Sequence, residues 1–379
     1  MALSQRGSTM DPVRYEDYRP VERPSYQAEL DAVVAQVAQR TGASVEREAV
    51  GRAVRTAHGK TYGLLKATVT VGDNRGFHGQ GIFARPTVYD AVVRYSNGLG
   101  HQRPDHQLGA ACGMGIKLFG VPGRSLLADE PDTGTFDLNL INNDVFFANT
   151  AYDYMVVEEL FAELPEGLAN PARRKTWMAE FLTRRGTLTD PDGWLWDELF
   201  AMLSFTTVPR RNLLSYTYNS MGAFRYGDHI AKIRTVPTAE SLAALTHQIV
   251  DVRADNEAFR RTLVAEATER DHSFELQVQL NTDLARMPVD NTSVKWPEEL
   301  SPWVTVARVD LPRQDIGGED NVEAADATSI TPWRSREEHR PIGEIQRVRQ
   351  EVYRRSSIER HRLNGQQRRE PVSSAQLLG

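Results

Sequence analysis

The chain has 379 residues, a formal net charge of −6 and a single cysteine, Cys112. This mild acidity argues against binding to nucleic acid, which needs a basic surface. One cysteine rules out an intrachain disulfide and any zinc or iron–sulfur centre built on several thiolates, and it favours a reducing, cytoplasmic setting. Hydrophobic residues make up 40% of the chain, enough to bury a sizeable core.

Residues 1–26 are polar and contain several arginines, so they predict an irregular N-terminal arm rather than a signal peptide. An arm of this kind often packs across a partner subunit, which leaves a homo-oligomer open. No run of residues reaches the ~18 apolar positions that a membrane span needs, and no membrane span is expected.

The first predicted helix covers residues 27–54, where apolar side chains recur at helical spacing. The pattern then changes to short β-rich runs separated by clusters of Gly, Pro, Asp and Asn. Four strands are predicted in this part, at 64–71, 91–96, 114–119 and 136–140. Short strands at this spacing favour an antiparallel sheet that curls into a barrel.

Helical periodicity returns at 151–163, 171–185, 192–203 and 239–268, and strands are predicted again at 273–279 and 303–310. A last helix is predicted at 343–362, directly after Pro341. We therefore predict an α+β fold with one domain at 27–363. It consists of an antiparallel β-barrel, a helical insert at about 151–268 and the C-terminal helix, and a flexible tail follows at 364–379.

The last predicted helix carries Arg349, Tyr353 and Arg360 on one stripe. Guanidinium groups beside a phenol favour its ionised form. A tyrosinate is a hard anionic ligand that suits ferric iron, and some haem proteins use it. The alternative is a solvated, arginine-rich helix that only packs the Tyr353 ring against the barrel.

Three other segments hold polar groups suited to a buried ligand. His58 lies just before a predicted strand and has an unperturbed pKa near neutrality, as a general acid–base needs. Ser96 can orient a histidine by accepting its ring N–H. Asn142 precedes a Phe pair, so its amide can bind a small polar ligand in an apolar pocket, unless this is only an Asn-rich turn.

In order and combination these segments resemble the haem catalase superfamily, in particular its short bacterial catalase-like branch, which is related to coral-type allene oxide synthase domains. The resemblance covers roughly residues 55–364. The family's R-x-x-H-x-K, R-[FY]-S and N-x-x-V-F-F segments appear at 55–60, 94–96 and 142–147. Its R-x-x-x-Y segment, with an arginine seven residues later, appears at 349–360.

The resemblance implies that Tyr353 is the axial ligand of a haem b iron and that Arg349 keeps it as the phenolate. On the opposite face of the haem, His58 and Asn142 would form the catalytic pair, with Ser96 supporting His58. Asn143 is the substitute for Asn142, because the segment aligns with a one-residue ambiguity. The other implied cofactor contacts are arginines that pair with the haem propionates and an aromatic pocket wall: Arg55, Arg94, Arg360 and Phe146.

Some positions depart from the family pattern. Ala110 and Cys112 stand where large catalases carry an acidic and a basic residue, so the acidic group that helps to draw peroxide into their main channel is missing. Ala57 stands where large catalases have Val and coral-type allene oxide synthases have Thr. Its small side chain opens space for an organic hydroperoxide.

The sequence thus predicts a haem-dependent oxidoreductase of catalase or peroxidase type that acts through a ferryl intermediate. Its expected partners are hydrogen peroxide or an organic hydroperoxide and, for a peroxidase, a small organic substrate. Two alternatives stay open: a fatty-acid hydroperoxide isomerase or lyase of allene-oxide-synthase type, and a non-catalytic haem-binding protein.

Overall fold

The computed structural model describes residues 11–379 except residues 49, 244 and 246–248. In this part of the chain, one antiparallel sheet runs in the order β5-β4-β3-β2-β1-β9-β8-β7-β6. A further pairing of β5 with β7 closes eight of these strands into a barrel, and β6 extends along β7. The strands are β1 (Thr61–Val71), β2 (Thr87–Asn97), β3 (Cys112–Leu118), β4 (Phe136–Ile141), β5 (Tyr218–Ser220), β6 (Phe224–Tyr226), β7 (His229–Pro237), β8 (His272–Leu280) and β9 (Val304–Leu311).

The barrel interior is filled by the inward-facing residue of every second strand position, as the two-residue period of a strand requires. Leu65, Val93, Ile116 and Leu138 are cross-strand partners along β1 to β4, and all four are buried in the main core. The opposite faces of β2, β3 and β4 therefore point outward, toward the helices.

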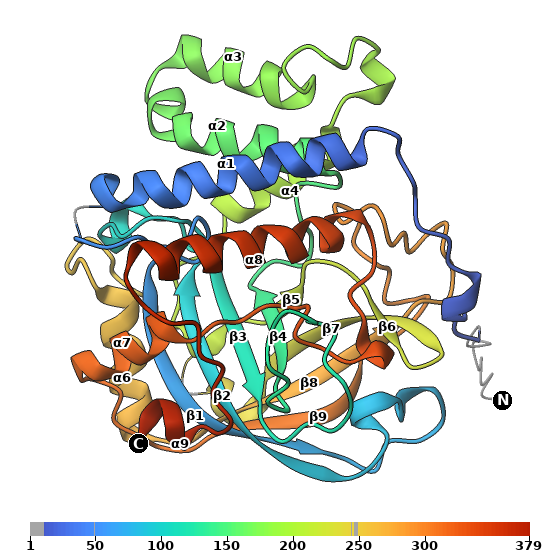
Figure 1. Ribbon diagram of the computed structural model, residues 1–379, viewed down its shortest axis with the longest axis vertical. Helices are drawn as coiled ribbons and strands as arrows, with labels where there is room; N and C mark the ends of the chain where they lie inside the picture. Colours follow the sequence, from blue (N-terminus) through green and yellow to red (C-terminus); the bar gives the residue numbers. More distant parts are fainter. Residues whose placement is uncertain (1–10, 49, 244, 246–248) are drawn as a thin grey trace, which may run out of the picture.

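One helix, α8, crosses this outward face and is covered in turn by α1 (Figure 1). Helices α2 and α3 lie beyond α1, whereas α6 and α7 pack beside β1 (Figure 1). The helices are α1 (Tyr26–Arg47), α2 (Ala151–Ala169), α3 (Pro171–Leu182), α4 (Trp196–Thr206), α5 (Ala239–Ala243), α6 (Ala258–Glu269), α7 (Glu319–Ala327), α8 (Glu344–Leu363) and α9 (Ala375–Leu378). The predicted α+β barrel with helices is confirmed.

The continuous helix predicted at 239–268 is wrong. The structure has the short α5 and then α6 from Ala258, with turns at 251–257 between them. The side chains of Asp251 and Asp255 accept hydrogen bonds from the backbone N–H groups of Arg253 and Glu257. Such local bonds compete with helical ones and hold the backbone in turns.

The segment predicted as a helical insert also contains β5, β6 and β7, and α7 was not predicted. β5 and β6 have three residues each, too few to show a period. β7 is buried on both faces over most of its length, so it lacks the alternation of a half-exposed strand.

Both ends of the described chain pack against the barrel. In the arm, Val13 N–H donates to Asn281 O at 2.8 Å and Tyr18 Oη donates to Asp290 at 2.7 Å. The tail differs from the flexible segment we predicted, because Glu370 pairs with Lys117 of β3 and α9 ends the chain beside β1.

Candidate functional site

The outward face of β2, β3 and β4 brings several predicted site residues together under α8. Arg94, Gly115 and Asn139 form one cross-strand row, and Ser96, Gly113 and Ile141 form the next. Glycine at the middle strand lets other side chains lie on the sheet, the His58 ring over Gly113 and Ile330 over Gly115.

His58 lies at this face in an unusual backbone conformation, with a φ of 56°. Its N–H donates to Gly98 O at 3.2 Å, and the next N–H donates to Leu99 O at 2.9 Å. The ring then turns toward Ser96, whose Oγ lies 3.1 Å from Nδ1. This is the contact predicted for Ser96, and a left-handed backbone at a non-glycine residue is common at functional sites.

Burial lowers the pKa of His58 to about 3, and the nearby positive charges of Arg94, Arg349 and Arg55 add to this effect. The imidazole is therefore neutral at pH 7. With Nδ1 facing the Ser96 hydroxyl, a neutral ring can accept a proton at Nε2.

Tyr353 approaches the same face from α8. Arg349, one helical turn earlier and 3% exposed, donates from Nη2 to Tyr353 Oη at 3.2 Å. Gln346 fixes the guanidinium by accepting from Nη1 at 2.7 Å. From the barrel side, Asn139 Nδ2 donates to Tyr353 Oη at 3.0 Å. The phenol oxygen thus accepts hydrogen bonds from α8 and from β4.

The three predicted propionate-binding arginines meet at the C-terminal end of α7. Arg55 donates to the Asp326 and Thr328 carbonyls at 2.7 and 2.8 Å, and Arg94 donates to Ala325 O at 2.8 Å. Arg360 donates to Asp326 O at 3.4 Å. Guanidinium groups at this position cap the helix, and their positive charge interacts favourably with the negative end of the helix dipole.

This arginine cluster is short of negative charge. The Asp326 carboxylate pairs with Arg52 and lies 3.9 Å from Arg55 and 4.0 Å from Arg94. Burial and repulsion from neighbouring arginines lower the pKa of Arg94 to about 9 and that of Arg360 to about 8. In the described chain, Arg360 Nε is buried and makes no hydrogen bond. Added carboxylates would relieve this imbalance.

An aromatic group borders the site. The rings of Phe146 and Phe147 lie 4.3 Å apart, and Phe205 of α4 packs edge-on against Phe147 at 5.0 Å. Phe146 and Tyr353 belong to the same hydrophobic cluster. Phe146 thus belongs to the hydrophobic cluster against which Tyr353 packs, and its role as a cofactor contact stays a prediction.

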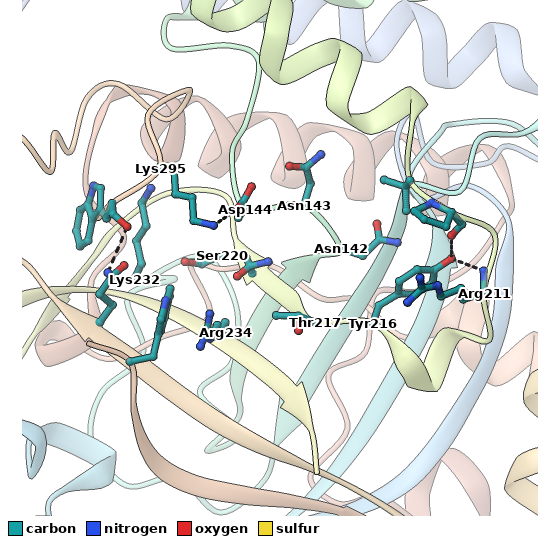
Figure 2. A pocket seen from close by; sticks show the side chains of 16 residues that line it. Asn142, Asn143, Asp144, Arg211, Tyr216, Thr217, Ser220, Lys232, Arg234 and Lys295 are labelled. Carbon is teal, nitrogen blue, oxygen red and sulfur yellow. Dashed lines mark hydrogen bonds and ion pairs between the residues drawn. The ribbon is translucent and has the colours of Figure 1, made fainter. Parts of the chain in front are cut away.

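Asn142 lies elsewhere than expected. Its Oδ1 accepts from Cys112 N–H at 2.7 Å and its Nδ2 donates to Ala110 O at 2.8 Å, so the barrel backbone occupies both ends of the amide. Asn143 donates to Ser204 Oγ at 2.8 Å. Both asparagines line a separate cavity, not the face that carries His58 (Figure 2).

That cavity has a volume of about 460 Å³ and is rich in basic and aromatic side chains (Figure 2). Lys232 of β7 lies 4.9 Å from the Trp296 ring centre, and burial lowers its pKa to about 8. Arg234 stacks on Trp303 at 4.3 Å. Lys232 and Arg234 were not predicted as site residues, because β7, which carries them, was not predicted.

The donor set fits a haem. It offers a phenol held by a buried arginine, a neutral histidine just before β1 that contacts Ser96 of β2, and an arginine cluster with one carboxylate, that of Asp326. Among the described residues, no group of three or more His, Cys, Asp and Glu side chains could hold a metal ion. Asn139 hydrogen-bonds the same phenol oxygen, so it would compete with a metal for that oxygen.

The fold is that of catalases. The chain is similar to a fungal catalase (TM-score 0.58, 14% identity, 96% of this chain and 68% of that one). It is also similar to catalase A from Saccharomyces cerevisiae (TM-score 0.57, 14% identity, 94% and 70%). A third match is a bacterial catalase (TM-score 0.55, 12% identity, 93% and 63%). At these identities the likeness establishes the fold.

No family model and no curated protein matches the sequence. Among the described helices, none combines the length and the apolar character needed to span a membrane.

Proposed function

We propose that this chain is a haem enzyme that consumes a peroxide, of catalase or peroxidase type. The observation that supports this most is the placement of Tyr353 with Arg349 on α8 opposite His58 with Ser96 on the barrel. The two pairs come from distant parts of the chain. One pair offers an iron ligand, and the other offers a group that can take and return a proton.

Tyr353 would hold the iron of a haem b through its phenol oxygen, to which Arg349 donates a hydrogen bond. Arg55 and the buried Arg94 and Arg360 would pair with the two haem carboxylates, which supply the charge that the cluster lacks. When bound, a haem would supply the redox chemistry: two electrons for the reduction of one peroxide, recovered from a second peroxide or from an organic substrate.

His58 would act as the general base and acid. With Nδ1 held by Ser96, Nε2 of the neutral ring is free to take the proton of an entering peroxide and return it to the departing oxygen. The Phe146 and Phe147 rings would exclude competing water.

The first test is haem binding. The protein should take up one haem per chain and show a ferric spectrum of the tyrosinate type. Tyr353→Phe should lose that spectrum or the haem itself. Tyr152→Phe is the matched control, because Tyr152 packs against the same hydrophobic cluster. A chain that takes up no haem would refute the proposal.

The second test separates the activities. Oxygen release from hydrogen peroxide indicates a catalase, and peroxide-dependent oxidation of a dye indicates a peroxidase. Consumption of a fatty-acid hydroperoxide without oxygen release and without dye oxidation would instead support an isomerase or lyase. Bound haem without any of these reactions would leave a haem-binding protein.

A further inference from the structure

Asn139 is the amide that contacts the ligand tyrosine. It lies on β4, is 7% exposed and donates from Nδ2 to Tyr353 Oη at 3.0 Å. Its neighbours Leu138 and Leu140 point into the barrel core, so the alternation of the strand turns Asn139 outward toward α8.

Asn139 also stands close to the position of His58. The His58 ring lies over Gly113, and Gly113 pairs with Ile141, two residues along β4 from Asn139. Diagonal neighbours in an antiparallel pair are about 7–8 Å apart, within reach of side chains that converge on a small ligand. Asn142, by contrast, follows the end of the strand and has both ends of its amide bound to backbone groups.

We infer that Asn139, and not Asn142, is the amide of this site, and that it has two positions. Without haem it holds the oxygen of Tyr353 and competes with iron for it. With haem bound it is displaced from that oxygen and remains on the barrel side, beside His58, where it donates to a ligand of the iron. The second position rests on the proposed function, whereas the first does not.

The first experiment tests the contact in protein prepared without haem, by thermal unfolding of single and double variants. Asn139→Ala should lower the melting temperature in the wild-type background but by clearly less in Tyr353→Phe, because the acceptor is already gone. Asn142→Ala should lower the melting temperature by the same amount in both backgrounds. Equal shifts for Asn139→Ala in both backgrounds would refute the contact.

The second experiment uses haem-loaded protein and measures cyanide binding to the ferric iron by absorbance. Loss of one neutral hydrogen bond corresponds to about a five- to tenfold weaker affinity, which we expect for Asn139→Ala. Asn139→Leu keeps the volume of the side chain and should weaken cyanide binding by a similar factor. It keeps the test valid if Asn139→Ala folds poorly. Asn142→Ala should stay within about twofold of wild type, since its amide is bound elsewhere.

The outcomes separate the two ideas. Weaker cyanide binding in the Asn142 variant alone, or in neither variant, would overturn the role given to Asn139 while haem binding stands. If the wild-type chain takes up no haem, the proposed function fails and the second position with it. The unfolding experiment still decides whether Asn139 holds Tyr353.

Discussion

At the scale of single residues, the ring of His58 occupies the space that a side chain at position 113 would fill. A Cβ placed on Gly113 would overlap the Cε1 and Nδ1 atoms of the imidazole. The absence of a side chain on β3 thus allows His58 to lie against the barrel and reach Ser96.

We therefore expect Gly113→Ala to displace His58 without removing the haem ligand. The haem spectrum should persist, while peroxide turnover falls at least about tenfold because a misplaced general base loses most of its effect. Gly42→Ala is the control, since nothing lies within 4 Å of the Cβ it would gain. Unchanged turnover in haem-loaded Gly113→Ala would contradict the position assigned to His58.

His58 also predicts a pH dependence of stability. In the folded chain its pKa is lowered to about 3, whereas an unfolded histidine titrates near 6.5. As the pH falls, the unfolded state therefore binds the proton before the folded state does. The stability that His58 contributes is fully present above pH 6.5 and is lost as the pH falls toward 3. Between pH 7 and 5 this amounts to about 2 kcal/mol.

Urea unfolding of haem-free protein at pH 7 and pH 5 measures this effect. His58→Gln should lose about 2 kcal/mol less than wild type between the two pH values, because glutamine does not titrate. Other buried histidines such as His339, whose pKa burial also lowers to about 3, affect both proteins alike. Equal losses would show that His58 is not buried as described.

At the scale of elements, α7 organises the arginine cluster. Its C-terminal carbonyls accept from Arg55, Arg94 and Arg360, and Asp326 in its last turn supplies the carboxylate. The sequence analysis predicted these arginines as a group by family resemblance, but it missed α7 and therefore Asp326.

Removing this carboxylate should destabilise the chain. In Asp326→Asn the arginine cluster loses its carboxylate, whose close partner Arg52 is partly exposed while Arg55 and Arg94 lie about 4 Å away, so the cost should be about 1–3 kcal/mol. Asp320→Asn, at the exposed start of the same helix, should cost below about 1 kcal/mol. Urea unfolding gives both values for the haem-free protein.

The same comparison in haem-loaded protein tests the propionate role. Haem carboxylates should replace part of the missing charge, so the cost of Asp326→Asn should shrink. A haem dimethyl ester, which lacks that charge, should give no such rescue. Equal rescue by both compounds would argue against the propionate contacts.

The elements that the sequence predicts well are those with a clear period. Between residues 64 and 140, the predicted strands either alternate apolar and polar residues or are continuously apolar, and turn residues separate them. The structure has β1 to β4 in this part of the chain. The Phe136–Ile141 run also holds the clue to Asn139, because Leu138 and Leu140 alternate with it. Family resemblance directed our attention to Asn142, and only the register of β3 against β4 shows that the barrel backbone binds its amide.

At the scale of the whole molecule, the chain covers about two thirds of the length of the fungal catalase and still closes the barrel. Its last residues take part in this closed structure. Lys117, fully buried on the outward face of β3, pairs with Asp137 at 2.7 Å and with Glu370 of the tail. Arg334 lies 3.1 Å from the second oxygen of Glu370.

The tail should therefore contribute to the stability of the barrel. Glu370→Gln leaves Lys117 with Asp137, and Arg334 with Asp137 and Glu130, but removes one anion from each of these two buried cations, which should cost about 1–3 kcal/mol. Glu299→Gln, on an exposed loop, should change stability by less than about 0.5 kcal/mol. Thermal unfolding with calorimetry measures both.

A chain that stops after Asn364 should lose at least as much stability as Glu370→Gln, since it also removes the Arg368–Glu130 pair and the bond from Ser374 N–H to Asp90. Arg334 and Lys117 both pair with Asp137 of β4, the strand that also carries Asn139. The loss of stability should therefore extend to this face of the barrel. A truncated chain that unfolds at the wild-type temperature would show that the tail is the flexible extension the sequence predicted.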